Sequence, residues 1–189
     1  LHIVDELCAG LEYAHQHTIH RDIKPENVMV LPDGAVKLMD FGISKLMANT
    51  RLTSASMVMG TPMYMSPEQL KNSSDVDARA DVYSVGVLLY EMLTSNLPGG
   101  VPKPPSEVRS DVPPQFDEIV RTCVEPDREK RYQTITELRD ALLAVRLSST
   151  SGAKTIATVP PSSLRRYKTS ARRMAGVILA LLIVALTSL

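Results

Sequence analysis

The segment 81–94 is apolar on nearly every side, and this constrains the fold more than any other feature of the sequence. It is too short to cross a bilayer, which takes about 20 residues, and it contains Glu91. A helix that is apolar all round must be covered by other elements. We therefore predict a buried core helix, with apolar positions Val82, Tyr83, Val85, Val87, Leu88, Leu89, Met92 and Leu93.

Three further segments have helical periodicity with one apolar face, which predicts amphipathic helices over 3–14, 116–123 and 134–145. Two short apolar runs, 28–31 and 35–38, flank Pro32-Asp33-Gly34 and predict strands joined by a turn. The sequence thus favours a mostly helical fold with one short β-ribbon.

Two stretches predict irregular structure. Residues 43–65 are polar and lack periodicity, which indicates a long loop of the kind that usually has a function. Residues 97–114 contain several Pro and Gly residues, which helices tolerate poorly, so we expect no long helix there. Cys8 and Cys123 have no metal-site or framework spacing, and buried thiols are favoured over a disulfide.

The C-terminal part differs in composition from the rest. Residues 146–189 hold seven basic residues and no Asp or Glu, whereas residues 1–145 hold 14 basic and 21 acidic residues. Residues 148–163 are rich in Ser, Thr, Ala and Pro and predict a disordered linker. Residues 174–189 carry no charge and follow a basic cluster at 165–173, which favours a truncated transmembrane helix with its N-terminal side cytoplasmic.

We therefore divide the chain into a globular domain (1–145), a basic juxtamembrane linker (146–173) and the transmembrane segment (174–189). This division predicts a single-pass protein of the cell membrane. The alternative is a hydrophobic C-terminal helix that folds back on the domain. Because the chain starts with Leu1 inside an expected helix and ends inside an apolar run, we expect it to be a fragment.

A set of motifs follows in fixed order along residues 20–132. They are His20-Arg21-Asp22-Ile23-Lys24-Pro25-Glu26-Asn27, Asp40-Phe41-Gly42, Gly60-Thr61-Pro62, Ser66-Pro67-Glu68, Asp81-Val82-Tyr83-Ser84-Val85-Gly86 and Asp127-Arg128-Glu129-Lys130-Arg131-Tyr132. With these motifs, residues 1–145 resemble the C-terminal lobe of eukaryotic-type (Hanks-type) protein Ser/Thr kinases, in particular bacterial transmembrane ones. The implied activity is ATP-dependent phosphorylation of Ser or Thr hydroxyls in proteins.

The resemblance assigns the chemistry residue by residue. Asp22 would accept the proton of the substrate hydroxyl, Lys24 would contact the transferring phosphate, and Thr61 would hydrogen-bond both. Asn27 and Asp40 would hold Mg²⁺, which binds oxygen ligands together with phosphates; Mn²⁺ can replace it. The nucleotide contacts implied are Lys24, Glu26, Asn27, Met29 and Asp40. Met29 would lie beneath the adenine, and Leu88 and Met92 would lie below Met29. The alternative for these three apolar residues is plain core packing.

The same resemblance implies supporting residues and phosphorylation sites. In the supporting set, His20 would pack against Phe41, and Asp81 would hold the backbone of the catalytic loop. Glu68 would pair with Arg131, and Arg128 is the competing partner for Glu68. Arg21 and Gly42 complete the set. His2, His15 and His17 have no partner set in the sequence and are interpreted as structural. Arg21 marks kinases that are activated by phosphorylation of the loop, and the candidate acceptors are Thr53, Ser56 and Thr50, in that order.

Some family elements are missing from the sequence. A glycine-rich loop, a strand lysine and the adenine-reading hinge would all precede Leu1, so we expect the chain alone to be inactive. The implied partners are ATP, a protein substrate, the membrane and a second copy for phosphorylation in trans; no nucleic-acid partner is expected. The alternatives are a pseudokinase or scaffold module, which intact Asp22, Asn27 and Asp40 disfavour, and a small-molecule phosphotransferase, which the motifs around Glu68 and Arg131 disfavour.

Overall fold

The computed structural model describes residues 1–41, 61–71, 75–100 and 102–151. Their elements follow one another as α1 (His2–Ala14), η1 (Pro25–Asn27), β1 (Val28–Val30), β2 (Val36–Leu38), η2 (Thr61–Tyr64), α3 (Pro67–Leu70), α4 (Arg79–Thr94), α5 (Pro105–Val108), α6 (Gln115–Cys123), η3 (Arg128–Lys130) and α7 (Ile135–Ser151). The fold is mostly helical with one two-stranded sheet, as predicted.

Helix α4 is the buried centre of the described part of the chain, which confirms the prediction made for residues 81–94. It packs against α5, α6, α7 and η2, and its side chains are buried along nearly the whole helix. Its last residue is followed by Ser95 in the left-handed conformation, with φ of 61°, which ends the helix.

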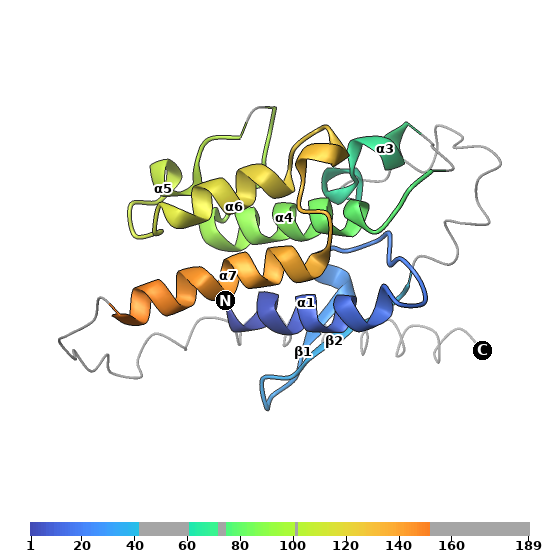
Figure 1. Cartoon of the computed structure of the whole chain (residues 1–189), viewed down its shortest axis with the longest axis horizontal. Coiled ribbons are helices and arrows are strands. Elements are labelled where there is room, and N and C mark those ends of the chain that lie inside the picture. The colour runs from blue at the N-terminus through green and yellow to red at the C-terminus, as the bar shows by residue number, and fades with distance from the viewer. Residues whose placement is uncertain (42–60, 72–74, 101, 152–189) are drawn as a thin grey trace, which may run out of the picture. The chain divides into compact units, whose positions relative to one another are not determined.

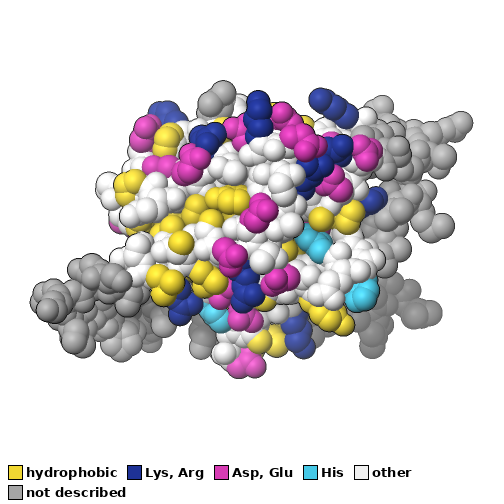
Figure 2. Space-filling model, viewed as in Figure 1, with side chains coloured by type: hydrophobic (Ala, Val, Ile, Leu, Met, Phe, Trp, Pro, Cys, Tyr) yellow, Lys and Arg dark blue, Asp and Glu magenta, His cyan; other side chains and the backbone are white. Residues whose placement is uncertain are grey.

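Helix α7 lies between α1 and the α4–α6 pair (Figure 1). Its buried residues are Ile135, Leu138, Leu142 and Val145, a helical spacing that faces the buried stripe of α1. At the edge of this contact Arg139 pairs with Asp5 at 2.7 Å and with Glu12 at 3.2 Å. Such pairs are typical of this surface, since Figure 2 shows basic and acidic side chains interleaved on the face that it displays.

The β-ribbon lies beside α1 (Figure 1). Strands β1 and β2 pair antiparallel, with Val28 opposite Leu38 and Val30 opposite Val36. The connecting turn has the predicted chemistry, because Gly34 adopts a φ of 89° and the Asp33 carboxylate accepts the Ala35 N–H at 3.0 Å.

One boundary differs from the sequence-based prediction. Helix α7 continues to Ser151, so the first residues of the predicted linker 146–173 are helical. Among the described residues of the connection 97–114, the one-turn helix α5 is the only helix, in agreement with the prediction of no long helix there. Ser106 attaches α5 to Asp117 of α6 through its N–H at 2.9 Å and its hydroxyl at 2.5 Å. The remaining linker and the segment 174–189 lie outside the described residues.

Within the described ranges, no helix has both the length and the apolar character that a membrane crossing requires. Cys8 and Cys123 are buried free thiols, as favoured from the sequence. Burial, with a smaller contribution from Asp5, raises the pKa of Cys8 to about 12, so this thiol stays protonated and unreactive at neutral pH.

The contact between α4 and α6 predicts a strong steric effect at Gly86. A Cβ atom there would lie 2.3 Å from the Cβ of Cys123. Gly86→Ala should therefore destabilise the fold by about 1–3 kcal/mol, measured by denaturant unfolding. The matched control is Gly99→Ala, because a Cβ at Gly99 meets nothing within 4 Å. Equal unfolding free energies for the two variants would contradict this packing.

Candidate active site

The Asp81 carboxylate holds the segment that precedes Asp22. It is fully buried at the start of α4 and accepts the N–H of His20 at 2.8 Å and the N–H of Arg21 at 2.7 Å. A third contact comes from Nε2 of His15, at 2.9 Å. A buried carboxylate is tolerated only when it is hydrogen-bonded in this way. The core helix thereby fixes the backbone of the loop.

Three side chains expected to act in catalysis lie together. Asp22 Oδ2 is 3.0 Å from Nζ of Lys24 and 3.0 Å from Nδ2 of Asn27, which also donates to the Asp22 carbonyl at 2.7 Å. Because these bonds use Nδ2 of Asn27, its amide oxygen can serve as an acceptor or as a metal ligand. The arrangement presents a carboxylate, an ammonium group and an amide oxygen side by side.

His20 connects this loop to the residues around Asp40. Its ring is fully buried; Nδ1 accepts the Asp22 N–H at 3.3 Å, and Nε2 lies 3.0 Å from the Met39 carbonyl, so these contacts place the ring proton on Nε2. The ring packs against Phe41 with centroids 4.6 Å apart, as expected from the sequence. His20 is therefore a structural bridge.

Asp40 is positioned by its neighbour Met39. The Met39 N–H donates to the Asn27 carbonyl at 2.9 Å, and its carbonyl meets His20, so both backbone groups of Met39 are attached to the catalytic loop. Asp40 itself is exposed and has a φ of 54°, a left-handed conformation that a non-glycine residue adopts at a cost. Strain of this kind is concentrated at functional sites.

The chemistry of Asn27 and Asp40 fits a hard cation. Both supply oxygen, and Mg²⁺ is commonly held by one or two carboxylates with phosphates and water. Across the described ranges, no group of three or more His, Cys, Asp or Glu side chains forms a metal cluster.

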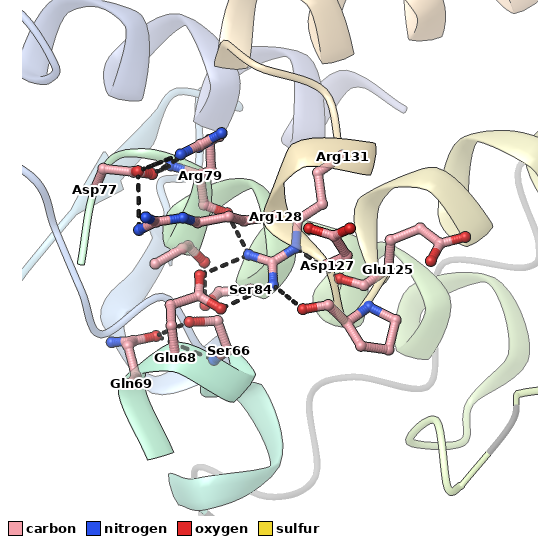
Figure 3. A network of polar contacts seen from close by, with 12 residues as sticks. Ser66, Glu68, Gln69, Asp77, Arg79, Ser84, Glu125, Asp127, Arg128 and Arg131 are labelled. Carbon is pink, nitrogen blue, oxygen red and sulfur yellow. Dashed lines mark hydrogen bonds and ion pairs between the residues drawn. The ribbon is translucent and has the colours of Figure 1, made fainter. Parts of the chain in front are cut away.

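Glu68 and Arg131 form the predicted pair, shown in Figure 3. The two carboxylate oxygens of Glu68 accept from Nη1 and Nη2 of Arg131 at 2.7 and 2.8 Å. The other guanidinium donors reach the carbonyls of Glu125, Arg79 and Pro126, so all five N–H groups of the buried Arg131 are used. The competing candidate, Arg128, instead binds Asp75 at 2.7 Å.

The segment between η2 and α3 is also attached to α4. Ser84 donates its hydroxyl to the Tyr64 carbonyl at 2.7 Å, and the Tyr64 hydroxyl donates to Glu91 at 2.5 Å. Burial, together with the hydrogen bond to Glu91, raises the pKa of Tyr64. Residues 61–68 are therefore held by α4 from one side and by Arg131 from the other.

Comparison with known proteins agrees with this geometry. A model of the protein kinase domain matches residues 1–156. This chain belongs to the protein kinase family. It is 40% identical over 162 residues to the serine/threonine-protein kinase PknB of Mycolicibacterium smegmatis, covering 77% of this chain and 26% of that protein. It is 36% identical over 156 residues to the probable serine/threonine-protein kinase CA_C1728 of Clostridium acetobutylicum, covering 75% of this chain and 24% of that protein.

A similar fold occurs in a solved kinase structure. The crystal structure of the PknI kinase domain of Mycobacterium tuberculosis matches with a TM-score of 0.60 and 28% identity. The match covers 75% of this chain and 53% of that domain. The chain thus spans about a quarter of the curated kinases and about half of a solved kinase domain.

Several residues of the predicted kinase site are not brought together by the described structure. The Thr61 side chain, Gly42, Thr50, Thr53 and Ser56 lie outside what the structure describes. Glu26 is exposed on η1, and Met29 is 42% exposed on β1, so a ligand can reach both. On α4, Leu88 is buried and Met92 is 40% exposed.

Sequence reasoning missed four contributors to this kinase site. His15 is structural, as interpreted from the sequence, but its contact with Asp81 across 66 residues of sequence was not foreseen. The side chains of Gln69, Tyr64 and Glu91 were not singled out either. For His15 the available signal was its place at the end of an amphipathic helix shortly before the catalytic loop. No local pattern marks the partners of the other three.

The Glu68–Arg131 pair makes a pH-dependent contribution to the stability of this kinase lobe. Burial favours the neutral acid, but the hydrogen bonds from Arg131 and the adjacent groups outweigh it and lower the pKa of Glu68. A carboxyl whose folded-state pKa lies below the unfolded value, about 4.3, stabilises the fold above that pH. The contribution is lost as the pH falls through the folded-state pKa.

Glu68→Gln should therefore cost about 3 kcal/mol at pH 7, because it leaves the buried Arg131 charge without its carboxylate. The difference in unfolding free energy between this variant and the unsubstituted chain should narrow between about pH 5 and pH 3. Urea unfolding at each pH measures it. Glu107→Gln, at an exposed position of α5, is the matched control and should show little change. A difference that stays constant down to pH 3 would contradict the role given to the Glu68 carboxylate.

Proposed function

We propose that this chain supplies the catalytic loop (residues 20–27) and the substrate-docking segment (residues 61–70) of a protein Ser/Thr kinase that transfers the γ-phosphoryl group of ATP. The observation that carries the proposal is the Asp22 carboxylate, held 3.0 Å from Lys24 Nζ and 3.0 Å from Asn27 Nδ2 on a loop fixed by Asp81. The similarity to bacterial Ser/Thr kinases supports the substrate class.

In the proposed reaction Asp22 orients the substrate hydroxyl and accepts its proton as the oxygen–phosphorus bond forms and the bond to the leaving ADP oxygen breaks. General-base assistance of this kind is worth about 10²–10⁴-fold in rate. Lys24, already beside Asp22, places positive charge where negative charge develops on the transferring phosphoryl group. The other proposed nucleotide contacts are Glu26 and Met29.

The proposed metal ligands are the Asn27 amide oxygen and the Asp40 carboxylate. Mg²⁺, when bound with ATP, neutralises phosphate charge and orients the γ-phosphate. The residues of this chain contribute the geometry, because Met39 attaches Asp40 to Asn27 through its N–H and to His20 through its carbonyl.

We further propose that activity requires an N-terminal lobe in the parent protein. The sequence of this chain has no glycine-rich loop and no strand lysine of the kind that holds ATP phosphates. Phosphoryl transfer depends almost entirely on positioning, so loss of half of the nucleotide site should abolish turnover.

Phosphorylation of the predicted loop 43–65 is the proposed activating event. Arg21 donates through Nη2 to the Val76 carbonyl at 3.2 Å, while its buried Nε has no hydrogen-bond partner among the described residues. A phosphate oxygen would satisfy that donor. The proposed acceptors remain Thr53, Ser56 and Thr50.

The test is a phosphotransfer assay with ATP, Mg²⁺ and a Ser/Thr-containing protein substrate. The parent protein that carries both lobes should phosphorylate the substrate and itself, with the autophosphorylated residues mapped to Thr53, Ser56 or Thr50. Asp22→Asn in that protein should lower kcat by about 10²–10⁴-fold. Residues 1–189 alone should show no turnover.

Asp140→Asn on the exposed surface of α7 is the matched control and should keep full activity. Turnover by residues 1–189 alone that Asp22→Asn abolishes would contradict the need for a second lobe. A two-lobed protein that binds ATP without turnover would instead identify a pseudokinase.

We also propose that the parent protein is anchored in the cell membrane by residues 174–189, with the kinase lobe on the cytoplasmic side. The support is compositional: the segment carries no charge and follows Arg165, Arg166, Lys168, Arg172 and Arg173. Deletion of residues 152–189 from the parent protein should move it from the membrane pellet to the supernatant after alkaline carbonate extraction. Extraction of the undeleted protein by carbonate would count against an integral span.

A further inference from the structure

Gln69 belongs to the docking segment and links it to the catalytic loop. Its Nε2 donates to the carbonyl of Arg21 at 2.8 Å, and its Oε1 accepts the N–H of Ser66 at 3.1 Å and the Ser66 hydroxyl at 3.2 Å. Figure 3 shows the Ser66 contact on the helix that also carries Glu68. We propose that Gln69 is a positioning residue that aligns Asp22, an inference that rests on the proposed kinase function.

The orientation of the Gln69 amide follows from its partners. The Ser66 N–H can only donate, so it must face Oε1, and the Arg21 carbonyl can only accept, so it must face Nε2. Both contacts are satisfied at the same time by one orientation. The side chain is therefore a two-ended link, and neither end can be exchanged for the other.

The Arg21 carbonyl belongs to the peptide unit that leads into Asp22. The N–H of the same peptide unit, from Asp22, donates to His20 Nδ1 at 3.3 Å. Gln69 therefore holds one side of this peptide plane and His20 holds the other. Because the plane sets the direction of the Asp22 Cα–Cβ bond, both contacts bear on the carboxylate that receives the proton.

The same peptide unit follows a strained residue. Arg21 has a φ of 65°, which a non-glycine residue keeps only when its surroundings hold it. Asp81 holds the Arg21 N–H at 2.7 Å, and Gln69 holds the carbonyl at the other end of the residue. Without Gln69 the carbonyl end is free to relax toward a less strained conformation.

The link also makes Asp22 sensitive to the docking segment. Glu68, adjacent to Gln69, is anchored to the buried Arg131, so α3 is rigidly placed when this segment is folded. Gln69 reaches Arg21 from that placement. Folding of residues 66–70 is thus coupled to alignment of the Asp22 carboxylate, through the contact between Gln69 and Arg21, 48 residues apart in sequence.

Two substitutions separate this role from simple helix capping. Gln69→Glu keeps an oxygen acceptor for Ser66, a pattern that is favourable at the third position of a helix, but at neutral pH it cannot donate to the Arg21 carbonyl. Gln69→Met has similar length and removes both contacts. Gln115→Glu, at the exposed start of α6, makes the same chemical change elsewhere and is the matched control.

Amide hydrogen exchange on the full chain 1–189 tests the link without requiring activity. Gln69→Glu should increase exchange several-fold in residues 20–24 and leave residues 67–70 protected, whereas Gln69→Met should increase exchange in both. Gln115→Glu should change neither. Unchanged exchange at residues 20–24 in Gln69→Glu would overturn the proposal, whatever the outcome of the phosphotransfer assay.

Steady-state kinetics in the two-lobed parent protein give the second readout. Gln69→Glu should lower kcat by roughly tenfold through misalignment of Asp22, with the KM for ATP changed less than about twofold. If Gln69 only stabilised the fold, Gln69→Glu would lower the melting temperature without lowering kcat more than it changes KM. Equal kcat values for Gln69→Glu and Gln115→Glu would overturn the proposal. If the unsubstituted parent protein is inactive, the proposed kinase function is refuted, and hydrogen exchange alone tests the link between Gln69 and Arg21.

Discussion

Three hydrogen bonds converge on the buried carboxylate of Asp81, and the site is built around them. They come from the backbone of His20 and Arg21 and from the side chain of His15. Leaving an ionised group buried without partners is costly, so the loop and the end of α1 must adopt the conformations that supply these donors. The left-handed Arg21 that precedes Asp22 is held in place by the same carboxylate. Because the buried Asp81 carboxylate needs these donors, the catalytic loop is held in one conformation.

Helix α4 serves the docking segment by the same means. Ser84 and Glu91 hold Tyr64 through its carbonyl and its hydroxyl, and the Arg79 carbonyl helps to orient Arg131 toward Glu68. One buried helix thus positions both of the segments that the proposed reaction would bring together at a substrate hydroxyl. Gln69 adds a direct connection between them, through the Arg21 carbonyl. Catalysis that relies on positioning requires a shared reference of this kind.

Sequence reasoning succeeded where the signal is local. The apolar periodicity of α1, α6 and α7 and the turn chemistry at Asp33-Gly34 depend on neighbours within a few residues, and the structure has those elements where they were expected. The pair Glu68–Arg131 was predicted from the family motif and is present. The extent of α7 was underestimated, because the Ser/Thr content after Val145 suggests a linker while the helix continues to Ser151.

By itself, the sequence determined that this chain has a mostly helical, kinase-like fold around a buried helix, and it predicted Asp22, Lys24, Asn27 and Asp40 as the reactive set. Residue type and short-range spacing are enough for both conclusions. Only the tertiary structure decided that His15 reaches Asp81, 66 residues away, and that Gln69 reaches Arg21, 48 residues away. Such contacts depend on how α1, α3 and α4 pack, and packing is a property of the whole core that no local pattern encodes.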